Sequence, residues 1–425
     1  MTNTTDLTTL PNGLPVLQMH TPGAQVSSAL FLTRAGSRFE TPETDGLTRF
    51  YSIMALKRTR GFPKQLDLLE EVDRIGGFIN VEANREYTAV YVKAYNPYFA
   101  DALRLLGEVV VHPHFDPADI EAEKQYFLTE IQNRFSDQNG SSIDELFKKI
   151  FPDQALAYSG VGSKNAVQAF NEGTLHMYRD TYYTGLNSSL ILNLGDGAET
   201  HGDFEGHLHN YFGALPQGYL AMPEPVSMSS DEDKSLKIPT STGATSIAIG
   251  FPAYSRTSPH RHAQLLIETM LSKTKSNTRF ANISVEEALA RSVGTSLFQF
   301  TDGGVFVIQA FGESKTSAQA HQRVLDEIER VSMVPVSPEE LARAQGYYAG
   351  MFMLGLHDPV EASFFYGLQM LLDGARALPG SGTQGALKSP HDFVTSLQAV
   401  NSDEIQGVAQ QIFNPGYMYT IAIGE

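Results

Sequence analysis

The feature that most constrains this chain is an internal repeat. The segment SSALFLTRAGSR, which begins at Ser27, has a counterpart in TSIAIGFPAYSR, which begins at Thr245. The segment DPADIEAEK, from Asp116, similarly corresponds to SPEELARAQ, from Ser337, and both pair an N-cap residue with a proline. A third match joins NSSLILNLGD to MYTIAIGE at the end of the chain. These matches share an offset of roughly 220 residues, which indicates a duplicated domain.

Each copy mixes strands with helices. β-branched, aromatic or alternating apolar residues predict strands at 15–19, 26–32 and 88–94. Apolar residues at helical spacing predict helices at 46–57, 65–75, 97–111 and 117–135. Groups of antiparallel strands beside long helices predict an α+β fold of two similar domains, each an antiparallel-rich sheet with helices packed on one face.

A polar segment separates the two copies. It contains Pro223, Pro225, several serines and the acidic run at 231–233, which together are typical of a linker. The sequence therefore predicts an N-terminal domain over 1–218, a linker over 219–236 and a C-terminal domain over 237–425.

Charge and cysteine content exclude several classes of function. The chain has 31 Lys and Arg against 48 Asp and Glu, a net charge of −17, which disfavours nucleic-acid binding and suits basic peptides. It has no cysteine, so any metal site must use histidines and carboxylates. The first residues show no secretory signal, and the apolar runs are too short to span a membrane. We therefore expect a cytoplasmic protein without a membrane span.

Three ordered motifs resemble the M16 peptidases, the family of mitochondrial processing peptidase, the bc1 core proteins and bacterial two-subunit peptidases. They are AGSRFETPETDGLTRFYSIMALKRT, IGGFINVEANREYTAVYV and HPHFDPADIEAEKQYFLTEI. They resemble the family's GSR-E…H-x-x-E-H, its GG-x-x-N…R-E-x-T segment and its helix P-x-F…E-E-I. The resemblance implies the two-domain, LuxS-like metallohydrolase fold of that family, in agreement with the repeat.

The zinc motif that the resemblance implies is degenerate in this chain. Arg49 and Ile53 stand where the two zinc-binding histidines would be, and Ser52 stands where the glutamate that activates water would be. None of the three can replace the family's residue, because arginine stays protonated, isoleucine has no donor atom and serine is a poor base. We therefore expect no catalytic residue and no metal in this chain, and we expect zinc in a partner subunit.

Two carboxylates of the family's helix remain. Glu130 matches the third zinc ligand, and Glu123 lies seven residues earlier on the same helix face. A buried carboxylate needs a partner, so we hypothesise that Arg49 replaces the metal by forming an ion pair with Glu130. The alternative is that both side chains point to water and ignore one another.

The residues that would bind substrate are less clearly marked. The segment FINVEANREYT matches an edge strand that pairs with the substrate backbone in active relatives, so Asn80 and Glu82 are candidate contacts. The same edge could equally be covered. The Arg and Tyr of R-E-x-x-G-L-A-Y in bacterial non-catalytic subunits have no counterpart in SVEEALARS, which leaves Arg279 or Arg291 as possible substitutes. Residues 271–280 also lack the glycine-rich loop of mitochondrial regulatory subunits.

These observations favour three functions. The first is a non-catalytic subunit that forms half of a clamshell chamber with a zinc-bearing M16 partner, which hydrolyses peptides. The second is a structural core protein of a larger complex, like the bc1 core subunits. The third is a metal-free homodimer that binds peptides. Under the first function the chain is inactive alone and its acidic side chains line a chamber for basic peptides.

Overall fold

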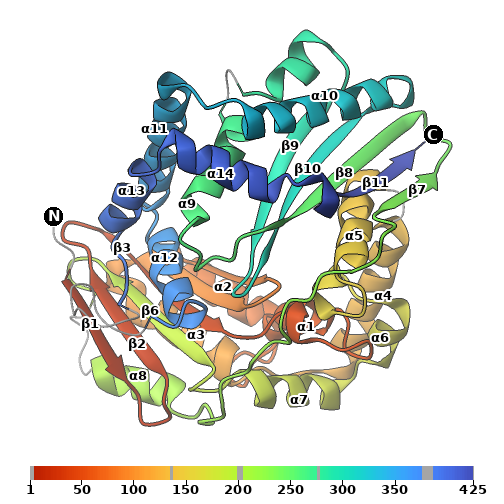
Figure 1. Cartoon of the computed structure of the whole chain (residues 1–425). Helices are drawn as coiled ribbons and strands as arrows, with labels where there is room; N and C mark the ends of the chain where they lie inside the picture. Colours follow the sequence, from red (N-terminus) through yellow and green to blue (C-terminus); the bar gives the residue numbers. More distant parts are fainter. Residues whose placement is uncertain (1–3, 135–136, 199–203, 275–277, 376–385, 425) are drawn as a thin grey trace. The chain divides into compact units, whose positions relative to one another are not determined.

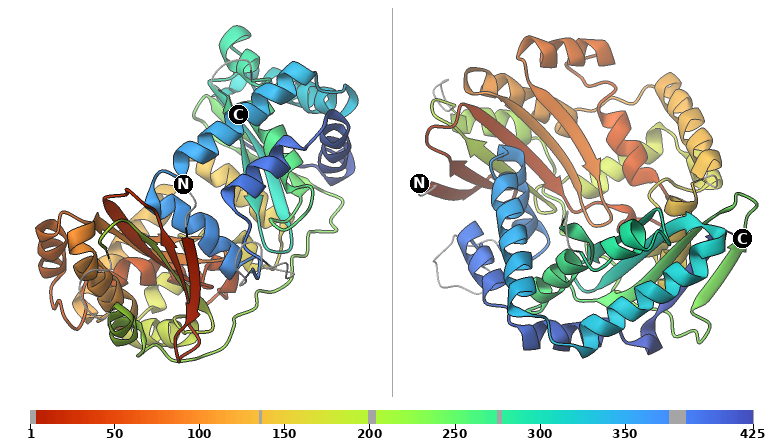
Figure 2. Two further views of the ribbon diagram at one scale, coloured as in Figure 1. Left: turned by 90° about the vertical axis from the view of Figure 1, so that its left-hand side faces the viewer. Right: turned by 90° about the horizontal axis from the view of Figure 1, so that it is seen from above.

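The computed structural model describes residues 4–134, 137–198, 204–274, 278–375 and 386–424. The chain forms two compact units, each built from three stretches of sequence (Figures 1 and 2). The first unit contains 1–131, 158–224 and 355–388, and the second contains 132–157, 225–354 and 389–425. No helix in the described part of the chain is long and apolar enough to cross a membrane.

The first unit is built on a six-stranded sheet with the order β1-β2-β6-β3-β5-β4. The strand β2 runs parallel to β6, and the other neighbours are antiparallel. The strands are β1 (Thr4–Thr9), β2 (Pro15–His20), β3 (Val26–Thr33), β4 (Phe78–Ala83), β5 (Thr88–Tyr95) and β6 (Ser188–Leu194).

The second unit is built on a five-stranded sheet with the order β7-β11-β8-β10-β9. The strand β7 runs parallel to β11, and the other neighbours are antiparallel. The strands are β7 (Ser235–Pro239), β8 (Ala244–Ala253), β9 (Ser292–Gln299), β10 (Gly304–Glu313) and β11 (Tyr419–Gly424).

The two sheets have the same topology once β1 is set aside. The order β2-β6-β3-β5-β4 corresponds strand for strand to β7-β11-β8-β10-β9, with the parallel pair in the same place. The predicted α+β duplication is therefore confirmed by strand order and pairing direction as well as by sequence.

Most helices cover one face of each sheet. In the first unit these are α1 (Leu47–Ala55), α2 (Gln65–Arg74), α3 (Phe99–Val111), α4 (Pro117–Arg134), α6 (Lys164–Ala169), α7 (Glu172–Tyr182) and α8 (Phe204–Phe212). In the second they are α9 (Arg261–Glu268), α10 (Ser314–Met333), α11 (Pro338–Gly355), α13 (Pro390–Gln398) and α14 (Ser402–Ile412). Short helical turns are η1 (Ser37–Phe39), η2 (Asn96–Tyr98), η3 (Ala155–Ala157), η4 (Thr269–Lys273), η5 (Asn282–Glu286) and η6 (Pro415–Tyr417).

Each sheet also buries its second face, under a helix from the other half of the chain. The helix α12 (Pro359–Leu371) packs on β3 and β6 of the first unit, where Tyr366 and Met370 join a cluster with Leu32 and Ile191. The helix α5 (Gln138–Ile150) packs in the same way on β8 and β11 of the second unit. The two strand pairs are equivalent in the repeat, so the halves exchange equivalent helices.

The compact units are therefore not the two halves of the sequence. The segments 132–157 and 355–388, which carry α5 and α12, each belong to the unit whose sheet comes from the other half. The boundaries 1–218, 219–236 and 237–425 concern the repeat along the sequence and stay a prediction. The exchange also places one helix on the face of each sheet opposite the main helical layer.

A glycine allows one of these exchanged helices to lie close to its sheet. A Cβ at Gly250 of β8 would lie 2.9 Å from Cδ1 of Ile150 and 3.0 Å from Cδ1 of Leu146, both on α5. Replacement of Gly250 by Val is expected to destabilise the second unit by about 1–3 kcal/mol, because a packed core resists added methyl groups. Urea unfolding of the full chain measures this loss.

The control substitution is Gly407→Ala in α14, where an added Cβ meets no atom within 4 Å among the described residues. That variant is expected to keep or raise stability, by up to about 1 kcal/mol, because alanine is the better helix former. An unchanged unfolding midpoint for Gly250→Val would show that α5 does not pack tightly on this sheet.

Candidate functional site

The helix α1 carries the degenerate motif and begins at a buried carboxylate. Gly46 precedes the helix with φ of 89°, a conformation that glycine adopts without strain. The backbone N–H groups of Gly46 and Thr48 donate to the two carboxylate oxygens of Glu40, at 2.9 and 2.7 Å. Glu40 thus satisfies two of the donors that every helix N-terminus leaves free, and it fixes where α1 starts.

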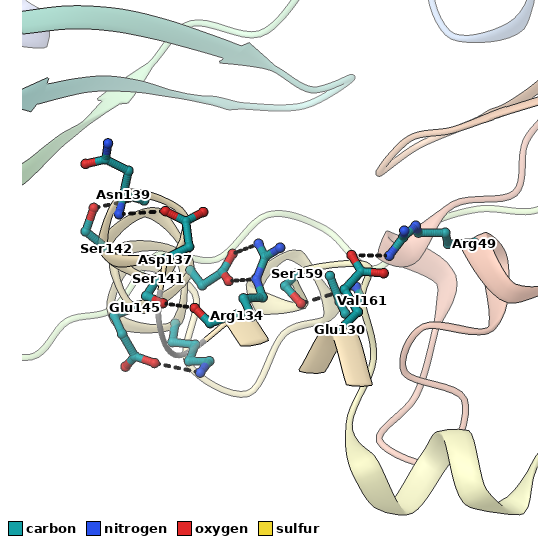
Figure 3. A network of polar contacts seen from close by, with 12 residues as sticks. Arg49, Glu130, Arg134, Asp137, Asn139, Ser141, Ser142, Glu145, Ser159 and Val161 are labelled. Carbon is teal, nitrogen blue, oxygen red and sulfur yellow. Dashed lines mark hydrogen bonds and ion pairs between the residues drawn. The ribbon is translucent and has the colours of Figure 1, made fainter. Parts of the chain in front are cut away.

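Arg49 and Glu130 form an ion pair between α1 and α4 (Figure 3). Nη1 of Arg49 lies 2.8 Å from Oε1 of Glu130, and the guanidinium carbon lies 5.0 Å from the ring centre of Phe127. Oε2 of Glu130 is buried and has no hydrogen-bond partner among the described residues. The predicted ion pair between Arg49 and Glu130 is therefore confirmed.

The other two motif positions are used for packing. Ser52 is buried, and its hydroxyl donates to the carbonyl oxygen of Thr48 at 2.7 Å, one turn earlier in α1. Ile53 is half-buried and packs against the main core of the first unit. Neither side chain offers a free donor atom toward α4.

Two further ion pairs join the end of α1 to α4. Nζ of Lys57 lies 3.3 Å from the carboxylate of Glu123, which is buried. Nε of Arg58 lies 2.5 Å from the carboxylate of Asp119. Together with the Arg49 pair they form a series of three cation–carboxylate contacts along α4. Both family carboxylates, Glu123 and Glu130, therefore have a cationic partner.

This donor set does not fit zinc. Structural and catalytic zinc sites need three or four nitrogen, sulfur or carboxylate ligands around one point. At this place the chain offers a carboxylate, an arginine and an isoleucine, and arginine cannot lose its proton to become a ligand. Elsewhere in the described ranges no group of three or more His, Asp or Glu side chains could hold a metal ion.

The predicted substrate residues of the first unit lie on β4, at the edge of its sheet. Nδ2 of Asn80 donates to the hydroxyl of Tyr91 at 3.0 Å, across the β4–β5 pair. Burial raises the pKa of Glu82, and the charge of Glu361 on α12 raises it further. Asn80 and Glu82 alternate along β4 with Val81 and Ala83. Their role as peptide contacts stays a prediction.

The two arginines proposed for substrate binding lie in the second unit. Arg279 makes a two-pronged ion pair with Glu340 of α11, with both N–O distances at 2.9 Å, and only 12% of its side chain is exposed. Arg291 is exposed, and its guanidinium lies 6.0 Å from the ring centre of Phe311. Arg279 is thus occupied by an internal partner. Residues 275–277 of the segment that lacks the glycine-rich loop fall outside the described residues.

The sequence analysis missed two buried groups that hold the site in place. One is Glu40, which caps α1. The other is the ion pair of Arg38 with Glu86, at 2.6 Å and almost fully buried, which ties the GSR segment to the turn after β4. Arg38 and Glu40 lie in the segment GSRFE and Glu86 lies in the segment REYT, so the residues stand within motifs of the resemblance although their sequence did not indicate these contacts.

Comparisons with known proteins agree with this arrangement. Residues 15–163 match the family model described as Insulinase (Peptidase family M16), and residues 169–347 match Peptidase M16 inactive domain. A mitochondrial-processing peptidase subunit beta of Blastocladiella emersonii is 25% identical over 99% of this chain and 88% of its own length. An uncharacterized zinc protease of Bacillus subtilis is 23% identical over 96% of both chains.

Solved structures share the fold. A protease from Helicobacter pylori matches with a TM-score of 0.86 at 16% identity and covers 100% of both chains. A peptidase M16 inactive domain from Pseudomonas fluorescens matches with a TM-score of 0.87 at 17% identity and covers 99% of this chain and 98% of its own.

The coupling of Arg49 to Glu130 can be measured by a double-mutant cycle with Arg49→Met and Glu130→Gln. We expect a coupling energy of about 1 kcal/mol, because the pair is well aligned although about a third of each side chain is exposed. The same cycle on Lys148 and Glu145, a pair three residues apart on α5 in which the lysine side chain is 58% exposed, should give about 0.3 kcal/mol. Equal values for the two cycles would contradict a special role for the Arg49 pair.

The burial of Glu40 predicts a pH dependence of stability. Desolvation raises the pKa of Glu40 from 4.5 to about 7, against the lowering effect of its hydrogen bonds to Thr48 and Gly46. Between these values the folded state keeps a proton that the unfolded state has lost, so stability should fall as the pH rises from about 4.5 to 7. The loss is on the order of 2–3 kcal/mol.

Urea unfolding of Glu40→Gln at several pH values in that window tests this prediction. The variant should lose most of the pH dependence, because its side chain stays neutral throughout. The control Glu43→Gln changes an exposed carboxyl three residues away and should leave the pH dependence intact. If Glu40→Gln retains the full dependence, another group is responsible.

Proposed function

The chain belongs to peptidase family M16, and from this premise we propose that it is a non-catalytic subunit of a two-subunit zinc peptidase. In this proposal a zinc-bearing relative supplies the H-x-x-E-H motif, the metal and the water that attacks the peptide bond. This chain supplies half of the enclosing chamber and part of the surface that holds the peptide.

The observation that carries the proposal is the ion pair of Arg49 with Glu130. In this proposal the guanidinium of Arg49 takes the place of the zinc ion beside Glu130. The ion pair still joins α1 to α4, so the fold can remain stable although this chain catalyses no reaction. A chain that had merely lost its motif would leave the acids Glu123 and Glu130 without partners, at a cost in stability. Here each has a cationic partner, which is consistent with a stable, specialised subunit.

The β4 edge of the first sheet supports a role in holding peptides. The strand β4 ends the strand order, and its residues are half-buried or exposed. An extended peptide added to such an edge gains backbone hydrogen bonds that barely depend on its sequence. Glu82 on this strand, together with the net charge of −17, would favour basic peptides.

The proposal is tested by purifying this chain and a zinc-bearing M16 relative from the same organism, separately and together. We expect neither chain alone to cleave a basic peptide efficiently, and the mixture to cleave it with about one zinc per pair of chains. If the relative alone is as fast as the mixture, this chain is not an activating subunit. If this chain forms a homodimer and does not bind the relative, a metal-free peptide-binding protein is the better account.

Charge substitutions in the active mixture separate peptide binding from assembly. Glu82→Lys is expected to raise the KM for a basic peptide several-fold, because it reverses a charge beside the proposed peptide strand. Glu329→Lys changes the net charge equally at an exposed position on α10 and should leave KM unchanged. Equal effects of the two substitutions would show that β4 does not bind the peptide.

A further inference from the structure

The second unit contains an open groove between α10 and the end of its sheet. The groove has a volume of about 370 Å³. Its floor is formed by Thr420, Ala422 and Gly424 of β11, and one wall by Ser317 and His321 of α10. Lys237 of the edge strand β7 lies at its rim. Figure 1 shows β7 and β11 side by side at this end of the sheet.

In the first unit a helix fills the equivalent position. The helix α8 packs against α3, the counterpart of α10, and buries Leu208 and Phe212 completely or nearly so. The ring of Phe212 stacks on Phe31 of β3 with ring centres 6.3 Å apart. The described part of the second unit has no helix that corresponds to α8.

Strand pairing identifies which residues of the two units are equivalent. Leu190 lies opposite Phe31, and Thr420 lies opposite Ile249, which is the counterpart of Phe31 in the sequence repeat. By the same registers Leu192 and Leu194 correspond to Ala422 and Gly424. The repeat further equates Val16 with Ser235, Gln18 with Lys237, Phe99 with Ser317, and Leu103 with His321.

Most of these substitutions replace a large apolar side chain with a small or polar one, whereas Ala29 of the first unit corresponds to the larger Ile247 in the groove. Five fully or almost fully buried side chains under α8, namely Val16, Phe99, Leu103, Leu190 and Leu192, become Ser235, Ser317, His321, Thr420 and Ala422 in the groove. A groove that received an apolar helix would keep its leucines, because burying them drives such packing. The lining therefore suits a polar ligand better than a second copy of the α8 arrangement.

The polar groups around the groove favour an anion. Lys237 is exposed and makes no ion pair within the described ranges. Nε2 of His321 is buried and has no hydrogen-bond partner in the described part of the chain. Burial lowers the pKa of His321, so the ring is predominantly neutral near pH 7 and can donate one hydrogen bond. Ser317 and Thr245 also line the groove, and the hydroxyls of both bond to Ser314, at 2.8 Å to its carbonyl oxygen and 2.9 Å to its hydroxyl oxygen.

We propose that this groove binds a small ligand through an oxyanion group, a carboxylate or a phosphate, which Lys237 pairs with and His321 hydrogen-bonds. An ammonium and a neutral imidazole are both donors that recognise such a group, and charge-assisted contacts of this kind are the strong ones. The inference concerns a site in the second unit and does not depend on the proposed peptidase role.

The full chain is titrated with inorganic phosphate and, separately, with acetate, while the ring signals of its histidines are followed by NMR. Loss of one signal in His321→Asn identifies the His321 resonance. We expect that resonance to shift in a saturable way with at least one of the two anions. The anion that binds with the higher affinity shows whether the ligand carries a phosphate or a carboxylate. If neither anion moves it, the proposal is wrong.

A lysine pair distinguishes binding in the groove from a general effect of ions. Lys237→Met is expected to weaken the affinity about tenfold or more, because it removes the only formal charge assigned to the anion. Lys315→Met on α10 makes the same change in charge at an exposed residue that already pairs with Glu313, and it should leave the affinity unchanged. Equal affinities for Lys237→Met and the unaltered chain would overturn the proposal.

Discussion

The sheet of each unit has two apolar faces, and its second face is buried by a helix that the other half of the chain supplies. In the first unit α12 covers Leu32 and Ile191, and in the second α5 covers Ala248 and Ile421. Fully burying a leucine, isoleucine or phenylalanine side chain contributes about 1.5–3 kcal/mol, so these clusters are a large part of each unit's stability. Each sheet therefore depends on a helix from the other half of the chain to bury its second face.

Within the first unit, ion pairs between charged side chains join the α1 region to α4. A zinc ion in this family's motif would join the two helices through its ligands. Here Arg49, Lys57 and Arg58 pair with Glu130, Glu123 and Asp119, so electrostatic contacts hold the same two helices. Each pair contributes little by itself, but together they give Glu130, Glu123 and Asp119 each a cationic partner.

The two repeats have diverged where their surroundings differ. Both keep the strand order and the exchanged helix, because the cores require them. The first unit adds β1 at one sheet edge and α8 over the neighbouring face, whereas the same region of the second unit is an open groove lined by small and polar residues. Duplication thus supplied two copies of one framework, and different sites could arise on each.

The sequence by itself determined the family, the α+β repeat and the residues at the degenerate motif positions, whereas the pairing of Arg49 with Glu130 was a hypothesis until the structure showed it. Each of these depends on residues close together in one motif or on a periodic pattern, which a linear reading can detect. Three other features appear only in the tertiary structure. The polar segment β1 forms a strand because it pairs with the edge of β2. The helices α5 and α12 are exchanged between the two halves, and Glu40 caps α1. These features depend on which surfaces meet after folding, and local sequence patterns carry no record of such long-range contacts.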